Sequence, residues 1–534
     1  MYKDLPEEHK KILNSEQKAI IDSNERNIIV SASPGCGKTY TLVKKIEREF
    51  ASQSDKLGII ACSFTREAAK QLENKLANTV DLSLSFVGTI DAFVLTGIIF
   101  PYKNRCIKHL LQSEIFPDDF VITMPGPRTK SNEITKVGKK HLEVESYYMS
   151  WCNQFMQGTY EISYCSYLLA IDMIKNMPEV KNYLSARFTG IYIDEAQDLN
   201  EFQHDFIRTL KNDCGLKTFL IGDKNQSIYE FRGARPAFFS ALPEEGYVNY
   251  PISISVRCHK SIMDFSNCFL DSSYVPTPNN EVRVSVYEKT DAKVLETILF
   301  SSDSVLWLCD TNELAKIFFD YSLSKNLGFK YTKPIEINDE DFKGTYLNLL
   351  EEILRFYYNY KNPVASFAYS IENIETVLSD YILEKSLKAL RLILINTNQK
   401  PDIYLKLVFE KIGISIPSSV LDDIKDQLTD SICFEHYVKT EDKKRIMTIH
   451  GAKGLEAKCV IIFVDYDNWT YNNRQEDKES RYRAYYVGFS RAEEELHIFF
   501  RKDKIVKHGN SLPIIQTIVR DIIKTSYDKV SELS

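Results

Sequence analysis

A glycine-rich segment near the start of the chain combines residue types that bind nucleotide phosphates. Residues 31–40 read SASPGCGKTY and follow the apolar run NIIV. In a turn between a strand and a helix, backbone N–H groups point inward and form a nest for phosphate oxygens. A lysine at the end of the turn adds a cation, and the next hydroxyl can ligate Mg²⁺. We therefore predict a site for a nucleoside triphosphate and Mg²⁺ formed by Ala32, Ser33, Pro34, Gly35, Cys36, Gly37, Lys38 and Thr39.

Two adjacent acids follow a second apolar run, in IYIDEAQD at residues 191–198. Asp194, at the end of the expected strand, can hold Mg²⁺ through its water shell. Glu195 can polarise a water molecule for attack on a phosphate. Adjacent acids after a strand are also common as surface charge. Their position behind a phosphate loop favours the catalytic interpretation.

The segment FLIGDKNQSIYEFRGA at residues 219–234 combines an amide with aromatic side chains. Gln226 is a neutral amide that can contact a γ-phosphate or the attacking water. Tyr229 and Phe231 offer ring faces on which nucleic-acid bases can stack, at about 1–3 kcal/mol per base. The alternative is that both rings pack inside a strand or loop.

The pattern of apolar runs predicts the elements that position these residues. Short β-branched runs, each followed by a helical pattern, begin near residues 27, 58, 190 and 217, and a second set begins near residues 304, 445, 459 and 495. Such alternation indicates βα units in a parallel sheet, with ligands at the carboxyl ends of the strands. We predict an α/β fold of two parallel-sheet domains, each with an inserted, mainly helical subdomain.

The composition limits the compartment and the mode of nucleic-acid binding. The chain has 534 residues and a net charge of −7, so any DNA or RNA must bind a local basic and aromatic lining. The eleven cysteines include no C-x-x-C pair, and the N-terminus MYKDLPEEHKK is charged. No apolar run approaches the ~20 residues that cross a bilayer. We expect reduced thiols, a cytoplasmic protein without membrane association and, from the histidine spacing, no structural zinc site.

Together these segments resemble the UvrD/Rep/PcrA-type helicases of superfamily 1. The phosphate loop, DEAQD, GDxxQSIYxFRGA, IHGAKGLE and YVGFSRA occur in the order of that family, from LNSEQ near residue 13 to about residue 491. The resemblance implies ATP hydrolysis coupled to 3′ to 5′ movement on single-stranded or tailed DNA. It also implies two RecA-like P-loop domains. We place the first at residues 1–95 and 181–258 around an insertion at 96–180, and the second at 259–330 and 441–534 around a helical insertion at 331–440.

Carried over residue by residue, the resemblance implies further nucleotide contacts. Gln17 in LNSEQ should read the adenine edge, and Glu456 should lie near the ribose. Arg257 in SVRCHKS and Arg491 in YVGFSRA match the two arginines that reach the γ-phosphate. An arginine of this kind is worth about 10³–10⁵ in rate.

The resemblance also implies where single-stranded DNA lies. The matching positions outside the aromatic segment are Phe64, Thr65, Thr89, Thr448 and His450. The chain departs from the family at four positions, and at one of them Phe231 replaces a tryptophan and keeps a ring that can stack. Tyr40 and Val256 replace an arginine and a tyrosine that sandwich the adenine, which would move the aromatic face across the base. Asp91 replaces a histidine, and a carboxylate would repel the phosphate backbone, so we do not expect Asp91 to contact DNA.

A narrower resemblance is to the helicase-like subunits of Gabija anti-phage systems. It rests on the short insertions, the RC pair after Val256 and the short segment after Arg491. This implies a nuclease partner of the ATPase–Toprim (OLD-like) class and activity switched on by exposed DNA ends. Alternatives are a regulatory ATPase that senses DNA ends with little unwinding, a DNA repair helicase, and a nucleotide-binding scaffold without turnover.

Overall fold

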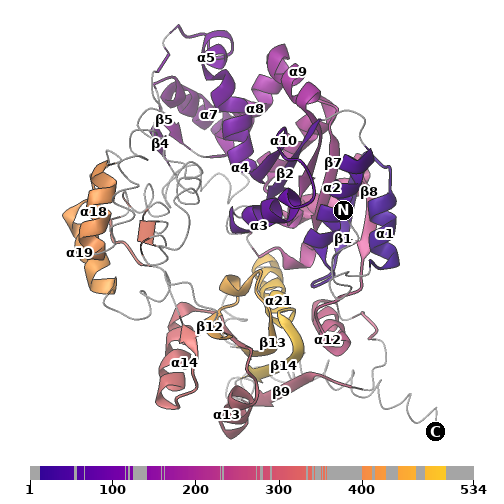
Figure 1. Ribbon diagram of the computed structural model, residues 1–534, viewed down its shortest axis with the longest axis vertical. Coiled ribbons are helices and arrows are strands. Elements are labelled where there is room, and N and C mark those ends of the chain that lie inside the picture. The colour runs from indigo at the N-terminus through magenta and orange to yellow at the C-terminus, as the bar shows by residue number, and fades with distance from the viewer. Residues whose placement is uncertain are drawn as a thin grey trace.

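Two parallel β-sheets dominate the computed structural model (Figure 1). The structure describes residues 13–52, 57–64, 66–114, 116–117, 121–123, 141–157, 159–161, 163–228, 230, 234–271, 273–276, 281–288, 292–331, 335–339, 342, 350, 353–354, 357, 400–411, 415–428, 443–464 and 475–500.

The first sheet has six parallel strands in the order β3-β2-β6-β7-β1-β8. They are β1 (Asn27–Ala32), β2 (Gly58–Ser63), β3 (Phe86–Thr89), β6 (Phe188–Ile193), β7 (Lys217–Gly222) and β8 (Val248–Ile252). The sequence predicts the four central strands and misses β3 and β8. Both lie at an edge and are largely half-buried or exposed, so neither shows a continuous apolar run.

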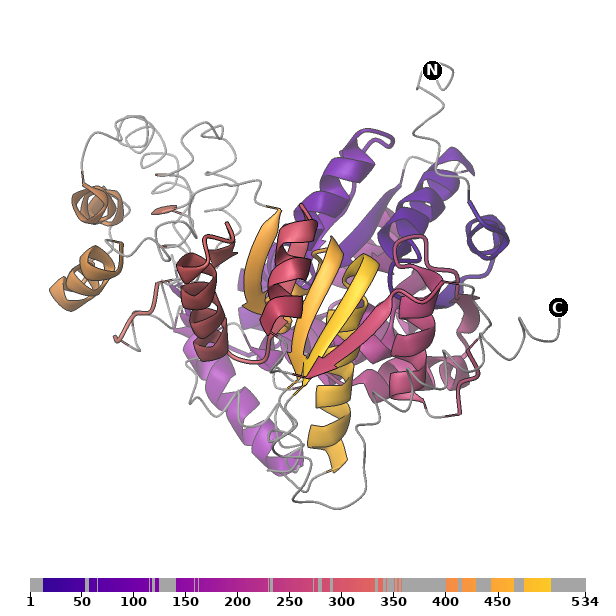
Figure 2. The same ribbon diagram turned by 90° about the horizontal axis from the view of Figure 1, so that it is seen from below.

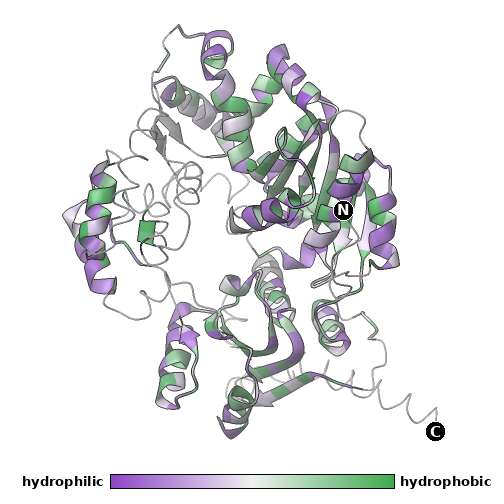
Figure 3. Ribbon diagram, in the orientation of Figure 1, coloured by the Kyte–Doolittle hydropathy of each residue, from purple (hydrophilic) through white to green (hydrophobic). Residues whose placement is uncertain are grey.

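Helices cover both faces of this sheet, because successive side chains of a strand point to opposite sides. Ile28 and Val30 belong to one apolar cluster with residues of α1, α2 and α3, whereas Ile29 belongs to another with residues of α8 and α10. The strands of this sheet are mainly hydrophobic, whereas the helices around them mix hydrophobic and hydrophilic residues (Figure 3). These helices are α1 (Ser15–Asp22), α2 (Lys38–Ser52), α3 (Arg66–Ala77), α8 (Tyr164–Asn176) and α10 (Glu201–Asn212).

Further elements surround the first sheet, and several of them join the second of these apolar clusters. Trp151 and Phe155 of α7 belong to it together with residues of α4, α5 and α9. The elements are α4 (Ile90–Phe93), the π-helix η2 (Val94–Ile99), α5 (Phe100–His109), β4 (Val121–Thr123), α7 (His141–Met156), β5 (Thr159–Glu161), α9 (Pro178–Arg187), α11 (Pro236–Ala241) and the 3₁₀ helix η6 (Leu242–Glu245).

The second sheet also has six parallel strands, in the order β11-β12-β10-β13-β14-β9 (Figure 2). They are β9 (Val284–Glu288), β10 (Val305–Cys309), β11 (Lys330–Tyr331), β12 (Lys444–Thr448), β13 (Ala457–Val464) and β14 (Ala492–Phe500). Leu306 and Leu308 share a cluster with α12 (Lys260–Leu270) and α21 (Gln475–Phe489). Trp307 faces the other side, with α13 (Ala292–Ser301) and α14 (Asn312–Ser324).

The two α/β halves confirm the predicted fold class, while the exact domain limits remain predictions. Two described helices fall in the stretch 331–440, α18 (Pro401–Lys411) and α19 (Ser418–Leu428), and they pack against each other at the left of Figure 1, apart from both sheets. The ten cysteines that the structure describes are all unpaired. In the described part of the chain, no helix is both long and apolar enough to cross a membrane.

Candidate nucleotide-binding and catalytic site

The loop between β1 and α2 has the backbone geometry of a phosphate-binding turn. Gly35 and Gly37 adopt the left-handed conformation, with φ of +66° and +81°, which favours glycine because a side chain is strained there. The Gln17 side-chain amide Nε2 donates to the Cys36 carbonyl at 3.1 Å and to Thr41 Oγ1 at 3.2 Å. Gln17 thus ties α1 to the loop, and its role toward adenine stays a prediction.

A hydroxyl and a carboxylate meet at the start of α2. The Thr39 hydroxyl donates to Asp194 Oδ2 at 2.6 Å. Asp194 follows β6, and its backbone N–H donates to the Cys62 carbonyl at the end of β2. Burial and the neighbouring Glu195 charge raise the pKa of Asp194. Both side chains offer oxygen atoms, which are the ligands that Mg²⁺ prefers, so the predicted pair fits a magnesium ion.

Glu195 lies among positive charges from both halves of the molecule. Its backbone has φ of +55°, a conformation that costs about 1–3 kcal/mol for such a residue and clusters at functional sites. Burial raises its pKa, but the charges of Lys38, Lys453 and Arg491 and a hydrogen bond from Gln197 outweigh burial. The pKa of Glu195 therefore lies below the usual range of a glutamate side chain, so this carboxylate is ionised at neutral pH.

Of the two predicted arginines, Arg257 lies against the phosphate loop and Arg491 acts electrostatically on Glu195. The backbone N–H of Val256 donates to the Gly35 carbonyl at 3.0 Å, which holds Arg257 against the phosphate loop. Arg257 Nε pairs with Glu456 Oε2 at 2.5 Å. Arg491 is only 3% exposed. Its guanidinium donates to the carbonyls of Val487, at 3.0 Å, and of Leu455.

The charges of Arg491 and its neighbours are electrostatically linked. Burial and the like charge of Arg257 lower the pKa of Arg491 to about 10, while Glu195 and Glu456 oppose this effect. The side chains predicted as γ-phosphate lysine, base and arginines are therefore brought together between the two sheets. Asp223, which follows β7, also interacts with Lys38. Burial raises the pKa of the Asp223 carboxyl group to about 6, and the charge of Lys38 partly opposes this rise.

Two glutamines, Gln226 and Gln197, lie beside the acidic residues of the site. Gln226 ends the 3₁₀ helix η4 (Lys224–Gln226), and its buried side-chain amide lies beside Asp223. Gln197, in the 3₁₀ helix η3 (Ala196–Asp198), donates to Glu195 Oε2 and accepts from the Asp223 backbone N–H at 3.0 Å. Sequence reasoning missed this bridging role, although Gln197 stands inside the DEAQD motif.

A set of charged contacts joins the two halves beside the site. Lys453, next to the 3₁₀ helix η7 (His450–Ala452), forms an ion pair with the buried Asp198. Its ammonium group also donates to the Gln226 carbonyl at 3.3 Å. Arg483 of α21 donates to the Ser227 carbonyl at 3.0 Å and pairs with Glu230 at 2.6 Å. Sequence reasoning missed Lys453. The sequence offered only one indication of this contact: GAKGLE contains a single cation, Lys453, and DEAQD ends in an acid, Asp198.

The predicted DNA-contacting residues are only partly described. Thr65, Tyr229 and Phe231 lie outside the described residues. Phe64 is half-buried and His450 is exposed.

Two predicted threonine contacts have local hydrogen-bonding roles. Thr89 accepts from the Ala92 backbone N–H at 3.2 Å and so caps α4, while Thr448 accepts from the Gly451 N–H at 3.2 Å. Their contacts with DNA stay predictions.

The three departures from the family pattern that fall on described residues differ in their surroundings. Asp91 accepts a hydrogen bond from the Tyr167 hydroxyl, whose oxygen accepts from Gln203 Nε2 at 2.9 Å. Asp91 is therefore engaged inside its own half. Lys44 lies 5.7 Å above the centre of the Tyr40 ring, and Val256 is 64% exposed.

A phosphate-binding loop with an adjacent acidic pair, set between two parallel sheets, defines the class of P-loop nucleotide-binding proteins. The family model of the UvrD/REP helicase N-terminal domain matches residues 13–112 and 135–245. The family model of the UvrD-like helicase C-terminal domain matches residues 444–499. The chain therefore belongs to the UvrD/Rep helicase family.

Among individual relatives, the chain is 26% identical to the Gabija protein GajB of Bacillus cereus (strain VD045) over 528 residues, which cover 93% of this chain and 98% of that protein. It is 23% identical to DNA helicase II of Escherichia coli (strain K12) over 344 residues, covering 58% of this chain and 45% of the relative. It is 24% identical to the ATP-dependent DNA helicase PcrA of Staphylococcus epidermidis (strain ATCC 12228 / FDA PCI 1200), covering 42% and 35%. The chain thus spans nearly all of GajB and less than half of the two named helicases.

Proposed function

We propose that this chain is an ATP-driven motor that moves 3′ to 5′ on single-stranded DNA. We further propose that it acts in the cytoplasm as the helicase-like subunit of an anti-phage complex. The observation that carries the motor proposal is the meeting of Lys38 and Glu195 of the first half with Arg491 of the second. Unpaired buried thiols are typical of a reducing compartment.

Each group has a distinct role in ATP hydrolysis. Thr39 and Asp194 would hold Mg²⁺, which when bound neutralises charge on the phosphate oxygens. Lys38 would bind the β- and γ-phosphates, and Glu195 would orient the attacking water. The triphosphate charge opposes the cations that lower the Glu195 pKa, so bound ATP makes this carboxylate a better proton acceptor.

The contacts between the halves provide a way to couple hydrolysis to movement. Arg257 is held by Glu456, and binding of a γ-phosphate would offer Arg257 a second, stronger anionic partner. Opening of the halves after hydrolysis would break the Lys453–Asp198 pair. Closure and opening on ATP would therefore move DNA-binding surfaces of the two halves relative to one another.

A second function, a regulatory ATPase that senses DNA ends with little unwinding, is favoured by one observation. The chain spans 98% of GajB but only 45% of DNA helicase II, so more than half of the longer helicase has no counterpart in the match. In either function we propose DNA as the activator and a nuclease of the ATPase–Toprim class as the partner. Co-expression with such a nuclease followed by size-exclusion chromatography tests the partner.

One experiment separates the two functions. ATP hydrolysis is measured with and without single-stranded DNA, and strand separation is measured on duplexes with 3′ or 5′ tails. Hydrolysis stimulated by single strands, with separation of the 3′-tailed duplex, supports the motor. Stimulated hydrolysis without separation of either duplex removes the motor and supports the sensor. Absence of stimulation contradicts both.

Two lysines of the same helix provide the matched variants for this experiment. Lys38→Ala removes the cation of the phosphate loop and should abolish hydrolysis. Lys44→Ala removes a cation that pairs with Glu47 on the same helix, at 2.6 Å, and should leave hydrolysis unchanged. Equal loss of hydrolysis in both variants would contradict the assigned role of Lys38.

A further inference from the structure

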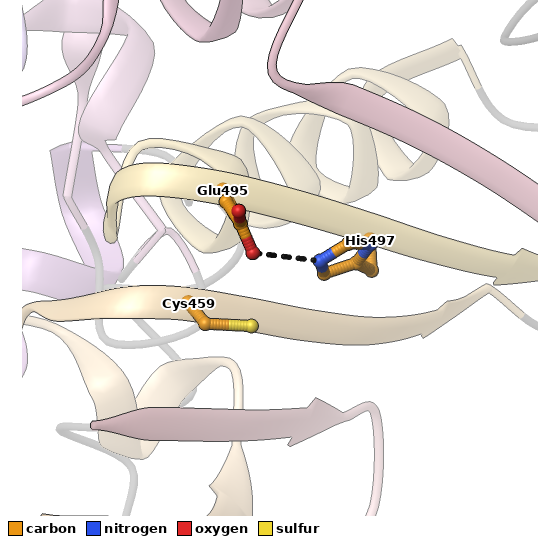
Figure 4. Close-up of side chains that lie close together, drawn as sticks. All are labelled: Cys459, Glu495 and His497. Carbon is orange, nitrogen blue, oxygen red and sulfur yellow. Dashed lines mark hydrogen bonds and ion pairs between the residues drawn. The ribbon is translucent and has the colours of Figure 1, made fainter. Parts of the chain in front are cut away.

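Three potential metal ligands lie together on two neighbouring strands of the second sheet (Figure 4). Cys459 of β13 stands opposite Glu495 of β14 in the strand register, and His497 follows two residues later on β14. Side chains two residues apart on a strand share a face. The sulfur, one carboxylate oxygen and one ring nitrogen all lie within 4.8 Å of one another.

The cluster lies on the face of the sheet opposite to α21. Cys459 belongs to the apolar cluster that includes α13 and α14, whereas α21 packs against the other face. A register shift between Ala457 and Cys459 interrupts the pairing of β13 with β14 beside the cluster. Such irregularities re-aim side chains and are over-represented near functional sites.

The imidazole of His497 is prepared to act as a ligand. Its Nδ1 lies 3.4 Å from the Tyr287 hydroxyl, while Nε2 lies 3.4 Å from Glu495 Oε2 and faces the cluster. A partner on one ring nitrogen is what orients a metal-binding histidine. His497 is only 9% exposed, and its ring stacks on the Tyr287 ring, with ring centres 5.9 Å apart, which also fixes its orientation.

The other two ligands also suit a metal. Glu495 is 42% exposed, which leaves a path from solvent, and Arg283 lies 3.6 Å from its other oxygen. Cys459 is 1% exposed. A thiol shielded from solvent in this way does not have the accessibility of a reactive redox cysteine.

The distances nearly suit one ion. Three atoms at most 4.8 Å apart have a common centre within about 2.8 Å of each, compared with metal–ligand distances of about 2.0–2.3 Å for zinc. Side-chain movements of about half an ångström would close this gap. A thiolate, an imidazole and a carboxylate are a typical zinc donor set, with water as the fourth ligand.

We propose that Cys459, Glu495 and His497 bind one Zn²⁺ ion. On binding, the Cys459 S–H bond breaks, its proton goes to solvent and a sulfur–zinc bond forms. The ion would join β13 to β14 close to Glu456 and Arg491, which precede these two strands. It would thereby hold the nucleotide-facing ends of both strands in one arrangement, independently of which function the ATPase serves.

Co²⁺ provides a spectroscopic test on the full-length protein, freed of affinity-tag histidines and of metal by chelation. Co²⁺ is titrated with excess Mg²⁺ present, and absorption from thiolate–cobalt charge transfer is recorded. Zn²⁺ is then added, and bound zinc is measured by mass spectrometry. We expect one Co²⁺ per chain, displaced by Zn²⁺. Because one proton is released per ion, the apparent affinity should rise about tenfold per pH unit between pH 6.5 and 7.5.

Matched variants assign the site. Cys459→Ser and His497→Ala should lose the thiolate band. Cys309→Ser should keep it, because Cys309 is also a buried cysteine of this sheet face but donates to the carbonyls of Thr311 and Met447. Glu495→Gln, at a half-exposed position, should fold normally and bind Co²⁺ at least tenfold more weakly. Zn²⁺ should raise the Tm of the wild type and not of Cys459→Ser.

Three results would overturn the proposal. One is the lack of stoichiometric Co²⁺ or Zn²⁺ binding by the wild type. Another is binding by Cys459→Ser and His497→Ala as tight as that of the wild type. The third is equal loss of the band in Cys309→Ser, which would assign the thiolate elsewhere.

Discussion

Replacing Gly35 by alanine tests whether the phosphate loop and Arg257 form one unit. A Cβ at this position would lie 2.5 Å from the Arg257 Cβ and 2.7 Å from the Ser255 Oγ. Ordinary carbon–carbon contacts lie at about 3.5–4.0 Å, so one partner must retreat by about 1 Å. The Arg257 Cβ moves only with its backbone. The substitution should therefore break the Val256–Gly35 hydrogen bond and displace Arg257 from the site.

The effect on catalysis can be separated from the effect on backbone strain. Gly35 and Gly215 have nearly the same φ, +66° and +68°, but a Cβ at Gly215 meets nothing within 4 Å. In both alanine variants the left-handed conformation costs about 1–2 kcal/mol. A displacement of 1 Å at a reacting centre can cost on the order of 10²-fold in rate. We therefore expect kcat/KM for ATP to fall on the order of 10²-fold in Gly35→Ala only.

The assay is steady-state ATP hydrolysis with saturating single-stranded DNA, paired with chemical unfolding of both variants. Loss of unfolding free energy in both variants, larger in Gly35→Ala because of the steric contact, with a selective loss of hydrolysis in Gly35→Ala would support the reasoning. Hydrolysis by Gly35→Ala within threefold of that by Gly215→Ala would refute it, because the displaced Arg257 would then have no catalytic effect.

Three further predictions concern the acids and one buried tyrosine. Glu195→Gln should lower kcat for ATP about 10²–10⁴-fold without weakening ATP binding in equilibrium titration, because a base is lost and no negative charge is added near the phosphates; the exposed Glu201→Gln is the control. Burial raises the pKa of Asp198 from 3.8 to about 6, so the folded state binds the proton of this carboxyl group more tightly than the unfolded state does. The contribution of Asp198 to the free energy of unfolding is therefore greatest below pH 3.8 and is lost as the pH rises to about 6. Urea unfolding at pH 5 and 7 should show Asp198→Asn gaining stability relative to wild type at the higher pH, and a constant difference would contradict the shift. Tyr167→Phe should lower the free energy of unfolding by about 1–3 kcal/mol, since it removes hydrogen bonds to Asp91 and the buried Gln203; an unchanged value in urea unfolding would contradict this role.

Local patterns in the sequence were sufficient for the central strands and for the groups attached to them. Parallel strands buried on both faces require continuous apolar runs, and these runs predict β1, β2, β6 and β7. Because ligand-binding groups follow the carboxyl ends of such strands, the motif positions also predict that the phosphate loop and Asp194 are neighbours. Glycines at left-handed positions and a Lys-Thr pair at a helix start are local features as well.

Only the tertiary structure decided which distant residues meet. The Lys453–Asp198 pair joins two motifs 255 residues apart, and nothing local in either motif encodes that contact. Cys459 and His497 show no metal-ligand spacing, so the sequence predicts no zinc site, yet the pairing of β13 with β14 places their ligand atoms together. The physical reason is that a residue's own segment determines whether it forms a strand or a turn, whereas strand order and register determine its neighbours.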